Sequence, residues 1–188
     1  MTEVIEAAAA LQAFCQALRW RFCIIGGLAL QRWGEPRTTI DVDVTLLTGF
    51  GGEEAFIERL LRQFDARIPD AGRFAREHRV LLLRSASGVG IDIALGGLPF
   101  EERAVARSSP FTYPPGIELL TCSAEDLIVM KAFAGRGQDW VDVERIIVRR
   151  GAALNWGLIT AELSPLAELK GAPEIMEQLE RRRIEFEL

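Results

Sequence analysis

One stretch of this chain decides its fold, and it runs Thr39-Ile40-Asp41-Val42-Asp43-Val44-Thr45-Leu46-Leu47. Apolar residues from Ile40 to Leu46 alternate with polar ones, which predicts a β-strand with one buried face and one polar face. Aspartate is depleted in strands, yet Asp41 and Asp43 lie on the same polar face, with their carboxylates roughly 7 Å apart along the backbone. Either this is the solvated face of an ordinary amphipathic strand, or the two acids have a function.

The segments before this strand predict a helix, a strand and a second helix. Apolar residues at helical spacing predict the first helix over residues 4–18, and a β-branched apolar run predicts a short strand over residues 22–25. Gly26 and Gly27 end that strand, and residues 28–33 have the pattern of the second helix. One interpretation of the glycine pair is a simple tight turn.

The segments after the deciding strand predict one helix and three more strands. They span residues 53–64, 79–84, 90–95 and 116–121. A hairpin around Gly88 is predicted to join the strands 79–84 and 90–95. The last strand follows a predicted proline-rich turn over residues 110–115.

The sequence therefore predicts an α+β protein in two parts. Residues 1–121 form a core in which a mixed sheet is flanked by helices, and residues 122–188 form a helical extension packed on it. The helical pattern begins after Ser123, a predicted N-cap, and continues through Glu187. It is interrupted near residues 135–137, 151 and 171–173. A chain of 188 residues is long enough to bury a proper core without disulfides or structural metals.

Composition limits the classes of protein to consider. The chain is 49% hydrophobic and 26% charged, which is typical of a globular protein. Its net charge of −5 argues against a large nonspecific nucleic-acid surface, but not against a local basic groove. The charge-free run over residues 22–30 is only half a membrane crossing, so we expect a cytoplasmic protein with no membrane partner. Cys15, Cys23 and Cys122 form no CxxC pair and are expected to be buried thiols.

A third aspartate lies in another predicted strand, in the sequence Ile91-Asp92-Ile93. If Asp92 converges with Asp41 and Asp43, three like charges about 5 Å apart repel one another by roughly 3 kcal/mol per pair at an effective dielectric constant of about 20. Such a cluster needs cations, and carboxylate oxygens without histidine or cysteine nearby suit Mg²⁺. Two such ions stabilise the attacking and leaving oxygens of a phosphoryl or nucleotidyl displacement.

These residues occur in an order that resembles a known family. The glycine pair Gly26-Gly27, the run Arg37-Thr38-Thr39-Ile40-Asp41-Val42-Asp43 and then Asp92 are similar to the nucleotidyltransferase fold of the DNA polymerase β superfamily. The chain resembles the AbiEii and MenT toxin-type nucleotidyltransferases in particular, because three more polar residues follow downstream. These residues are Lys131, Arg136 and Asp139.

The resemblance covers about residues 22–148 and implies a nucleotidyltransferase-like mixed sheet with a catalytic metal site. Asp41 and Asp43 would hold both Mg²⁺ ions. Asp92 would share the metal near the acceptor and help to deprotonate the attacking hydroxyl group. The glycine pair would let the backbone approach the phosphates of the nucleotide at the start of a helix, where free N–H groups favour anions.

The downstream positions implied by the resemblance bind the nucleotide. Lys131 would meet the triphosphate as a point charge. Arg37, Arg136 and Asp139 would complete the nucleotide-binding set. Asp139 and Asp142 both fit the late acid of the family, so the choice between them stays open.

Ordinary structural roles are the alternatives for three of these residues. Arg37 is then a surface arginine before a strand, and Lys131 extends from an amphipathic helix into water. Asp142, Arg145 and Arg149 then form surface pairs on a helix, at i+3 and i+4 spacing.

The sequence thus predicts an enzyme that uses Mg²⁺ to transfer a nucleoside monophosphate from a nucleoside triphosphate such as ATP to an acceptor hydroxyl group. As in toxin-type relatives, we expect an RNA or tRNA end as the acceptor, with a modest basic rim at Arg73, Arg76 and Arg79, and an antitoxin protein as a partner. A protein or an aminoglycoside is the alternative acceptor. Leu28 stands where many relatives have Ser or Thr, which motivates another alternative, a non-catalytic module that binds a nucleotide or a protein.

Overall fold

The structure, a computed structural model, describes residues 2–186 and groups them into two units. The first unit contains the described residues up to Leu28 together with Thr38–Cys122. The second unit contains Ala29–Arg37 and the described residues from Ser123 onward. The predicted division after residue 121, into a core and a helical part packed on it, stays a prediction.

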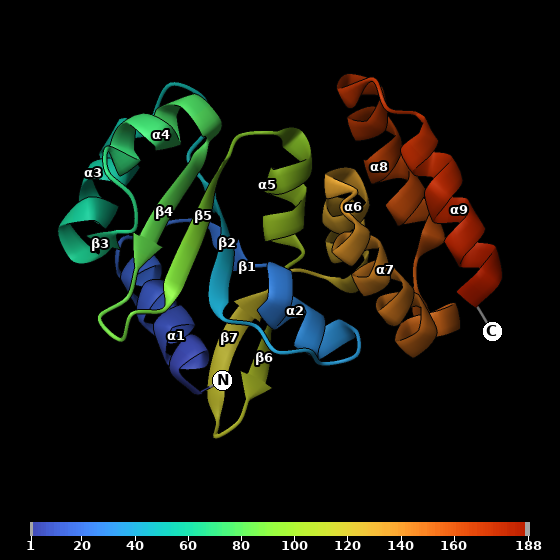
Figure 1. Ribbon diagram of the computed structural model, residues 1–188, viewed down its shortest axis with the longest axis horizontal. Helices are drawn as coiled ribbons and strands as arrows, with labels where there is room; N and C mark the ends of the chain where they lie inside the picture. Colours follow the sequence, from blue (N-terminus) through green and yellow to red (C-terminus); the bar gives the residue numbers. More distant parts are fainter. Residues whose placement is uncertain (1, 187–188) are drawn as a thin grey trace. The chain divides into compact units, whose positions relative to one another are not determined.

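The first unit is built on a seven-stranded sheet with the order β3-β4-β5-β2-β1-β7-β6 (Figure 1). The strands are β1 (Phe22–Ile24), β2 (Asp41–Leu47), β3 (Asp65–Ala66), β4 (Val80–Arg84), β5 (Gly90–Gly96), β6 (Ser109–Tyr113) and β7 (Ile117–Thr121). The pairs β2–β5 and β1–β7 are parallel, and the other neighbours are antiparallel. The predicted α+β class and mixed sheet are confirmed.

Strand β2 lies at the centre of this sheet, and its predicted alternation of half-buried and buried residues is confirmed from Asp41 to Val44, whereas Thr45, predicted on the polar face, is buried. Val42, Val44 and Leu46 are buried in the main hydrophobic core. The prediction was wrong for Ile40, which was placed on the buried face but is 77% exposed. The reason is that ladder pairing with β5 begins only at Asp41, so the residue before it is not held in the sheet.

Helices α1 (Thr2–Ala17), α3 (Glu54–Gln63) and α4 (Ala71–His78) contribute buried side chains to the same core as β2, β4 and β5. Helix α5 (Pro99–Ala106) packs against β1 and β2. The predicted helix over residues 53–64 and the hairpin around Gly88 are confirmed by α3 and by the antiparallel pair β4–β5. The elements α4, α5, β3 and β6 were not predicted.

The predicted proline-rich turn over residues 110–115 was wrong in its first half. Pro110 lies within β6, opposite Leu120 of β7. β6 is the edge strand of the sheet, where a residue without a backbone N–H group is tolerated. The turn itself is short, and the N–H of Gly116 donates to the carbonyl of Tyr113 at 2.7 Å.

The second unit is helical, as predicted. It contains most of α2 (Gly26–Trp33), then α6 (Ala124–Ala134), α7 (Gly137–Arg150), a short 3₁₀ turn at Gly151–Ala153, α8 (Trp156–Lys170) and α9 (Glu174–Phe186). Helix α6 packs against α7, α8 and α9. The predicted N-cap is confirmed, because the hydroxyl of Ser123 accepts from the N–H of Asp126 at 3.0 Å. Glu187, the predicted end of the helical part, lies outside the described residues.

Two predictions about chemistry outside the site are also tested by the fold. Cys15, Cys23 and Cys122 are buried thiols, as expected, and burial raises the pKa of the Cys15 thiol to about 12. Within residues 2–186, every helix is either too short or too polar to cross a bilayer.

Candidate active site

The paired glycines open helix α2 directly after β1, so the helix starts earlier than the predicted residue 28. A Cβ atom on Gly26 would lie 1.9 Å from Asp43 Oδ2, and one on Gly27 would lie 2.4 Å from Thr39 Oγ1. Gly26 also has a φ of +58°, a backbone conformation that favours glycine. The structure therefore brings the first glycine against the second aspartate of the deciding strand, with no room for a side chain.

Three aspartates lie on one face of the central strands, which we call the acidic face (Asp41, Asp43 and Asp92). Asp43 and Asp92 are register partners in the parallel pair β2–β5, and residues in register point to the same side of a sheet. Asp41 lies two residues before Asp43 on the same side, opposite Gly90. All three acids are half-buried. The residues next to them in each strand point to the opposite side of the sheet and are buried in the hydrophobic core.

The acidic face does not by itself form a complete metal site. Within the described part of the chain, no group of three or more His, Cys, Asp or Glu side chains is arranged to hold a metal ion. The predicted three-acid site for Mg²⁺ therefore stays a prediction. The structure does bring these residues together on one face of the sheet, where Gly26 lies against Asp43 and Asp43 pairs in register with Asp92.

Thr39 and Arg67 contact the acids but were not predicted as site residues. The hydroxyl of Thr39 donates to the backbone carbonyl of Asp41 at 3.2 Å and lies 3.4 Å from its Oδ1. Arg67 Nη2 lies 2.6 Å from Asp92 Oδ1, in an ion pair that is not aligned as a hydrogen bond. Thr39 belongs to the motif around Asp41, so its position in the sequence could have indicated a role in the site. Arg67 follows the two-residue strand β3, which was not predicted, and no sequence pattern marks it.

The predicted downstream residues form a separate cluster within the second unit, between α6 and α7. Lys131 Nζ lies 3.0 Å from Asp139 Oδ1 and 2.9 Å from Asp142 Oδ2. The side chains of Asp139 and Asp142 are 2% and 0% exposed, and that of Lys131 is 10% exposed. The interpretation of Lys131 as a side chain that extends into water is therefore wrong, because its ammonium group is held by two buried carboxylates.

Two arginines complete this cluster. Arg37 donates from Nε to Asp142 Oδ1 at 3.1 Å and from Nη2 to Asp142 Oδ2 at 3.2 Å, which is a two-point contact of guanidinium with carboxylate. Arg136 Nε donates to Asp139 Oδ2 at 2.6 Å. We call these five residues the α6–α7 ion cluster: Arg37, Lys131, Arg136, Asp139 and Asp142. Both candidates for the late acid thus contact Lys131.

The alternative that placed Asp142 on a helix surface is wrong. Asp142 is fully buried, and Arg145 Nη1 approaches its carboxylate only to 3.9 Å. Arg149 donates instead to the backbone carbonyl of Gly34. The predicted helical spacing is correct, but the face of α7 that carries Asp142 packs inward.

The cluster keeps both of its carboxylates charged. Burial raises the pKa of Asp139, but hydrogen bonds from Arg136 and Lys131 outweigh burial and leave that pKa below its ordinary value. Burial likewise raises the pKa of Asp142, and hydrogen bonds from Arg37 and Lys131 lower it by more. Both acids are therefore ionised at neutral pH and compensated by the surrounding cations.

The arginines predicted as a basic rim are offset by acids. Arg73 Nη2 lies 3.8 Å from Asp70 Oδ2, and Arg76 Nη1 lies 2.9 Å from Glu54 Oε2. Arg79 pairs with Glu53. Their positive charges are largely neutralised locally, so they make a weak footprint for an RNA backbone.

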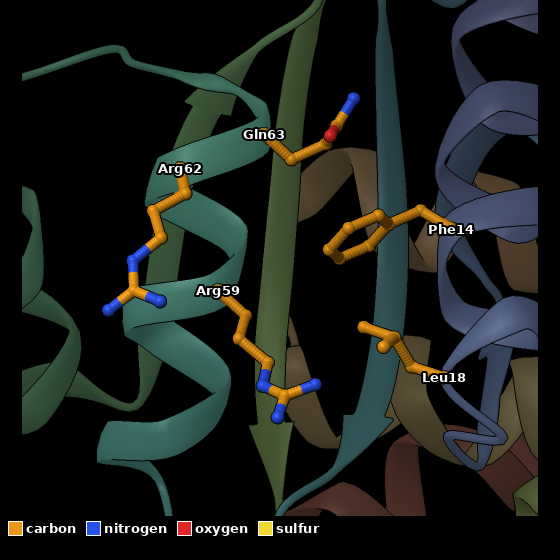
Figure 2. Close-up of a pocket in the computed structure, with 5 residues that line it drawn as sticks. All are labelled: Phe14, Leu18, Arg59, Arg62 and Gln63. Atoms are coloured by element: carbon orange, nitrogen blue, oxygen red, sulfur yellow. The ribbon is translucent and has the colours of Figure 1, made fainter.

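A separate hollow lies between α1 and α3 (Figure 2). It is lined by Phe14, Leu18, Arg59, Arg62 and Gln63. Both helices pack on the core side of the sheet, opposite the acidic face, so none of these five residues belongs to the predicted site.

Comparisons with known proteins agree with the fold and the motifs. The antigenic nucleotidyltransferase-like protein from Paracoccidioides brasiliensis has a similar structure, with a TM-score of 0.55 and 16% identity over 96% of this chain and 93% of that one. The antibiotic-resistance factor ANT(2″)-Ia has a TM-score of 0.52 and 16% identity over 94% of this chain and 97% of that one. At this level of identity, both likenesses establish the fold alone. No curated protein matches the chain.

The family itself is established by the sequence of the chain. Residues 9–172 match the family model described as the nucleotidyl transferase AbiEii toxin of a type IV toxin–antitoxin system. This match covers most of the 188 residues and includes every residue of the acidic face and of the α6–α7 ion cluster. The chain therefore belongs to the AbiEii family of nucleotidyltransferases.

Proposed function

We propose that this chain transfers a nucleoside monophosphate from a nucleoside triphosphate to an acceptor hydroxyl group, with release of pyrophosphate. The observation that carries the proposal is the contact of Gly26 with Asp43, whose register partner is Asp92. A glycine backbone that opens a helix beside a face of aspartates places anion-binding N–H groups next to potential metal ligands.

The donor chemistry of the acidic face fits Mg²⁺. Asp41, Asp43 and Asp92 would hold the ion, and all of them offer carboxylate oxygens, which Mg²⁺ prefers. When bound, Mg²⁺ supplies positive charge that offsets the repulsion of the acids and of the phosphates. Asp92 would accept the proton of the acceptor hydroxyl group through its carboxylate oxygen. Thr39, through its contact with Asp41, would fix the orientation of that carboxylate.

The family resemblance assigns two sets of residues to the nucleotide, the glycine pair in the first unit and the α6–α7 ion cluster in the second. Gly26 and Gly27 would present backbone N–H groups to its phosphates. Lys131 and Arg37 would supply positive charge toward the triphosphate, as the family resemblance implies, and Arg136 would assist them. Asp139 would then act on the nucleotide through Lys131 and Arg136, which it contacts.

For the acceptor, we propose the 3′ end of an RNA, and an antitoxin protein as the regulatory partner. The support for the antitoxin is the family, whose model describes a toxin of a toxin–antitoxin system. The RNA acceptor is what the resemblance to toxin-type relatives implies. Because Arg73, Arg76 and Arg79 contact acids, we expect the acceptor RNA to bind with modest affinity and to be recognised at its end. Protein and aminoglycoside acceptors are the competing possibilities.

One labelling experiment tests both the donor and the acceptor. The full chain is incubated with Mg²⁺ and each α-labelled triphosphate in turn, in the presence of total RNA, a protein extract or an aminoglycoside. We expect label in RNA, lost when the RNA 3′ hydroxyl groups are oxidised with periodate beforehand. Label only in protein or in the aminoglycoside would replace the acceptor, and label in none of them would contradict the proposed activity.

A further inference from the structure

Arg67 reaches the acidic face from the edge of the sheet. It follows β3, and its backbone N–H donates to the carbonyl of Leu82 in β4 at 3.0 Å. Leu82 is the register partner of Asp92 in β5. The side chain of Arg67 therefore crosses β4 above Leu82 and ends at Asp92, where Nη2 lies 2.6 Å from Oδ1.

Gly90 makes room for this guanidinium group. A Cβ atom on Gly90 would lie 2.6 Å from Arg67 Nη1 and 3.6 Å from the Cβ of Asp41, its register partner. Gly90 and Asp92 are two residues apart in β5 and point to the same side. The guanidinium group of Arg67 thus lies on the acidic face, over the segment of β5 from Gly90 to Asp92.

This placement makes Arg67 a cation among acids that otherwise repel one another. The side chains of Arg67 and Asp92 are only 27% and 28% exposed, and Asp92 Oδ1 is covered by its neighbours. A charge contact at this depth is screened less than one on the open surface. The guanidinium group of Arg67 therefore brings one positive charge to the acidic face.

We propose that Arg67 is a positioning residue that holds Asp92 while the acidic face carries no divalent cation, and that it competes with the cation for this carboxylate. The inference rests on the proposed function, because it requires the acidic face to bind a divalent ion. In this arrangement Arg67 stabilises the fold without metal and weakens the affinity for metal. Binding of a divalent ion then requires the guanidinium group to leave Asp92 Oδ1.

The test measures binding of Mn²⁺ alone to the full chain, without nucleotide, by electron paramagnetic resonance of the free ion. Arg67→Met removes the competing charge, so we expect its Kd for Mn²⁺ to fall by about tenfold. Without metal, the same variant should unfold at a lower temperature, and the rise of its Tm with Mn²⁺ should exceed that of the unsubstituted chain.

A second variant displaces the guanidinium group without removing it. Gly90→Ala places a methyl group against Arg67 Nη1, the far end of a flexible side chain, and Gly90 has no positive φ that would strain an alanine. We expect this variant also to bind Mn²⁺ more tightly. The matched control is Arg62→Met, at a position on α3 (Figure 2). It removes one positive charge from an exposed side chain that pairs with Glu58.

The outcomes separate this inference from the proposed function. Tighter Mn²⁺ binding in Arg67→Met and Gly90→Ala, with no change in Arg62→Met, supports it. Unchanged or weaker binding in both variants, in a protein whose Asp43→Asn form loses Mn²⁺, overturns the role of Arg67 and leaves the metal site intact. If Asp43→Asn binds Mn²⁺ as well as the unsubstituted chain, the metal site is wrong and both proposals fail.

Discussion

Gly26 and Asp43 are in such close contact that a methyl group at position 26 would lie 1.9 Å from Asp43 Oδ2. The glycine stands at the first residue of α2, and the aspartate stands in the middle of β2. The two residues are far enough apart in sequence that only the pairing of β1 with β2 brings them together. The contact joins the start of a helix, where anions bind, to the face of the sheet that carries the acids.

Gly26→Ala should lower both stability and transfer activity, because the new methyl group must displace the Asp43 carboxylate. Gly49→Ala is the matched control: Gly49 also has a positive φ, of +71°, but a Cβ atom added there would meet nothing within 4 Å. Thermal or urea unfolding should show a loss of about 1 kcal/mol in the control, from backbone strain alone. A larger loss in Gly26→Ala is expected, and equal losses in the two variants would contradict the close contact.

Lys131→Met should destabilise the second unit strongly, since it leaves two buried carboxylates without their shared cation. Breaking a buried ion pair in this way costs about 3–5 kcal/mol. Lys170 is the other lysine of the chain and is exposed, so Lys170→Met should change stability by less than about 1 kcal/mol. Urea unfolding followed by circular dichroism measures both. A small effect of Lys131→Met would mean that the α6–α7 ion cluster is not as buried as described.

The effect of Lys131→Met should also depend on pH. The pKa values of Asp139 and Asp142 are lowered in the folded chain, since cations outweigh the effect of burial. Groups of this kind stabilise a fold above their unfolded pKa, about 3.9 for aspartate, and the stabilisation is lost as the pH falls through the lower folded pKa. The stability difference between the unsubstituted chain and Lys131→Met should therefore be full at neutral pH and shrink below about pH 4. A constant difference across this range would contradict the charge-based origin.

Thr39→Val tests whether the hydroxyl group of Thr39 helps to orient the carboxylate of Asp41. Valine keeps the shape of threonine but removes the hydroxyl group that contacts Asp41. We expect kcat/KM for the triphosphate to fall by about tenfold, as is typical for the loss of a hydrogen bond to a charged group. Thr48→Val, which removes a partly exposed hydroxyl group near Gly96, should leave kcat/KM unchanged. Equal rates in the two variants would argue that Thr39 serves only the fold.

Short-range patterns in the sequence were sufficient to predict most of the elements and the acidic strand. The alternation from Asp41 to Leu46 predicted β2, because burial on one side and water on the other repeat with the period of a strand. The helices after Ser123 were predicted because the N-cap and the glycines mark their ends. Ile40 broke the alternation because it lies outside the ladder, which only the pairing partner reveals.

The features that were missed depend on contacts between distant segments. Arg67 is one of many arginines, and its place on the acidic face follows from the register of β3, β4 and β5. The burial of Asp142 follows from the packing of α7 against α6, which the helical spacing alone leaves undecided. Pro110 indicated a turn, and only the order of the sheet shows that its strand is at an edge.

The most direct test of the account is transfer of label from an α-labelled triphosphate to RNA by the Asp43→Asn variant. Asparagine keeps the size of the side chain and removes the charge that would bind the cation. Asp70→Asn is the control, since Asp70 is exposed and asparagine tolerates its left-handed backbone. We predict that Asp43→Asn folds and transfers no detectable label, while Asp70→Asn transfers it at the rate of the unsubstituted chain. Undiminished transfer by a folded Asp43→Asn variant would contradict the central claim.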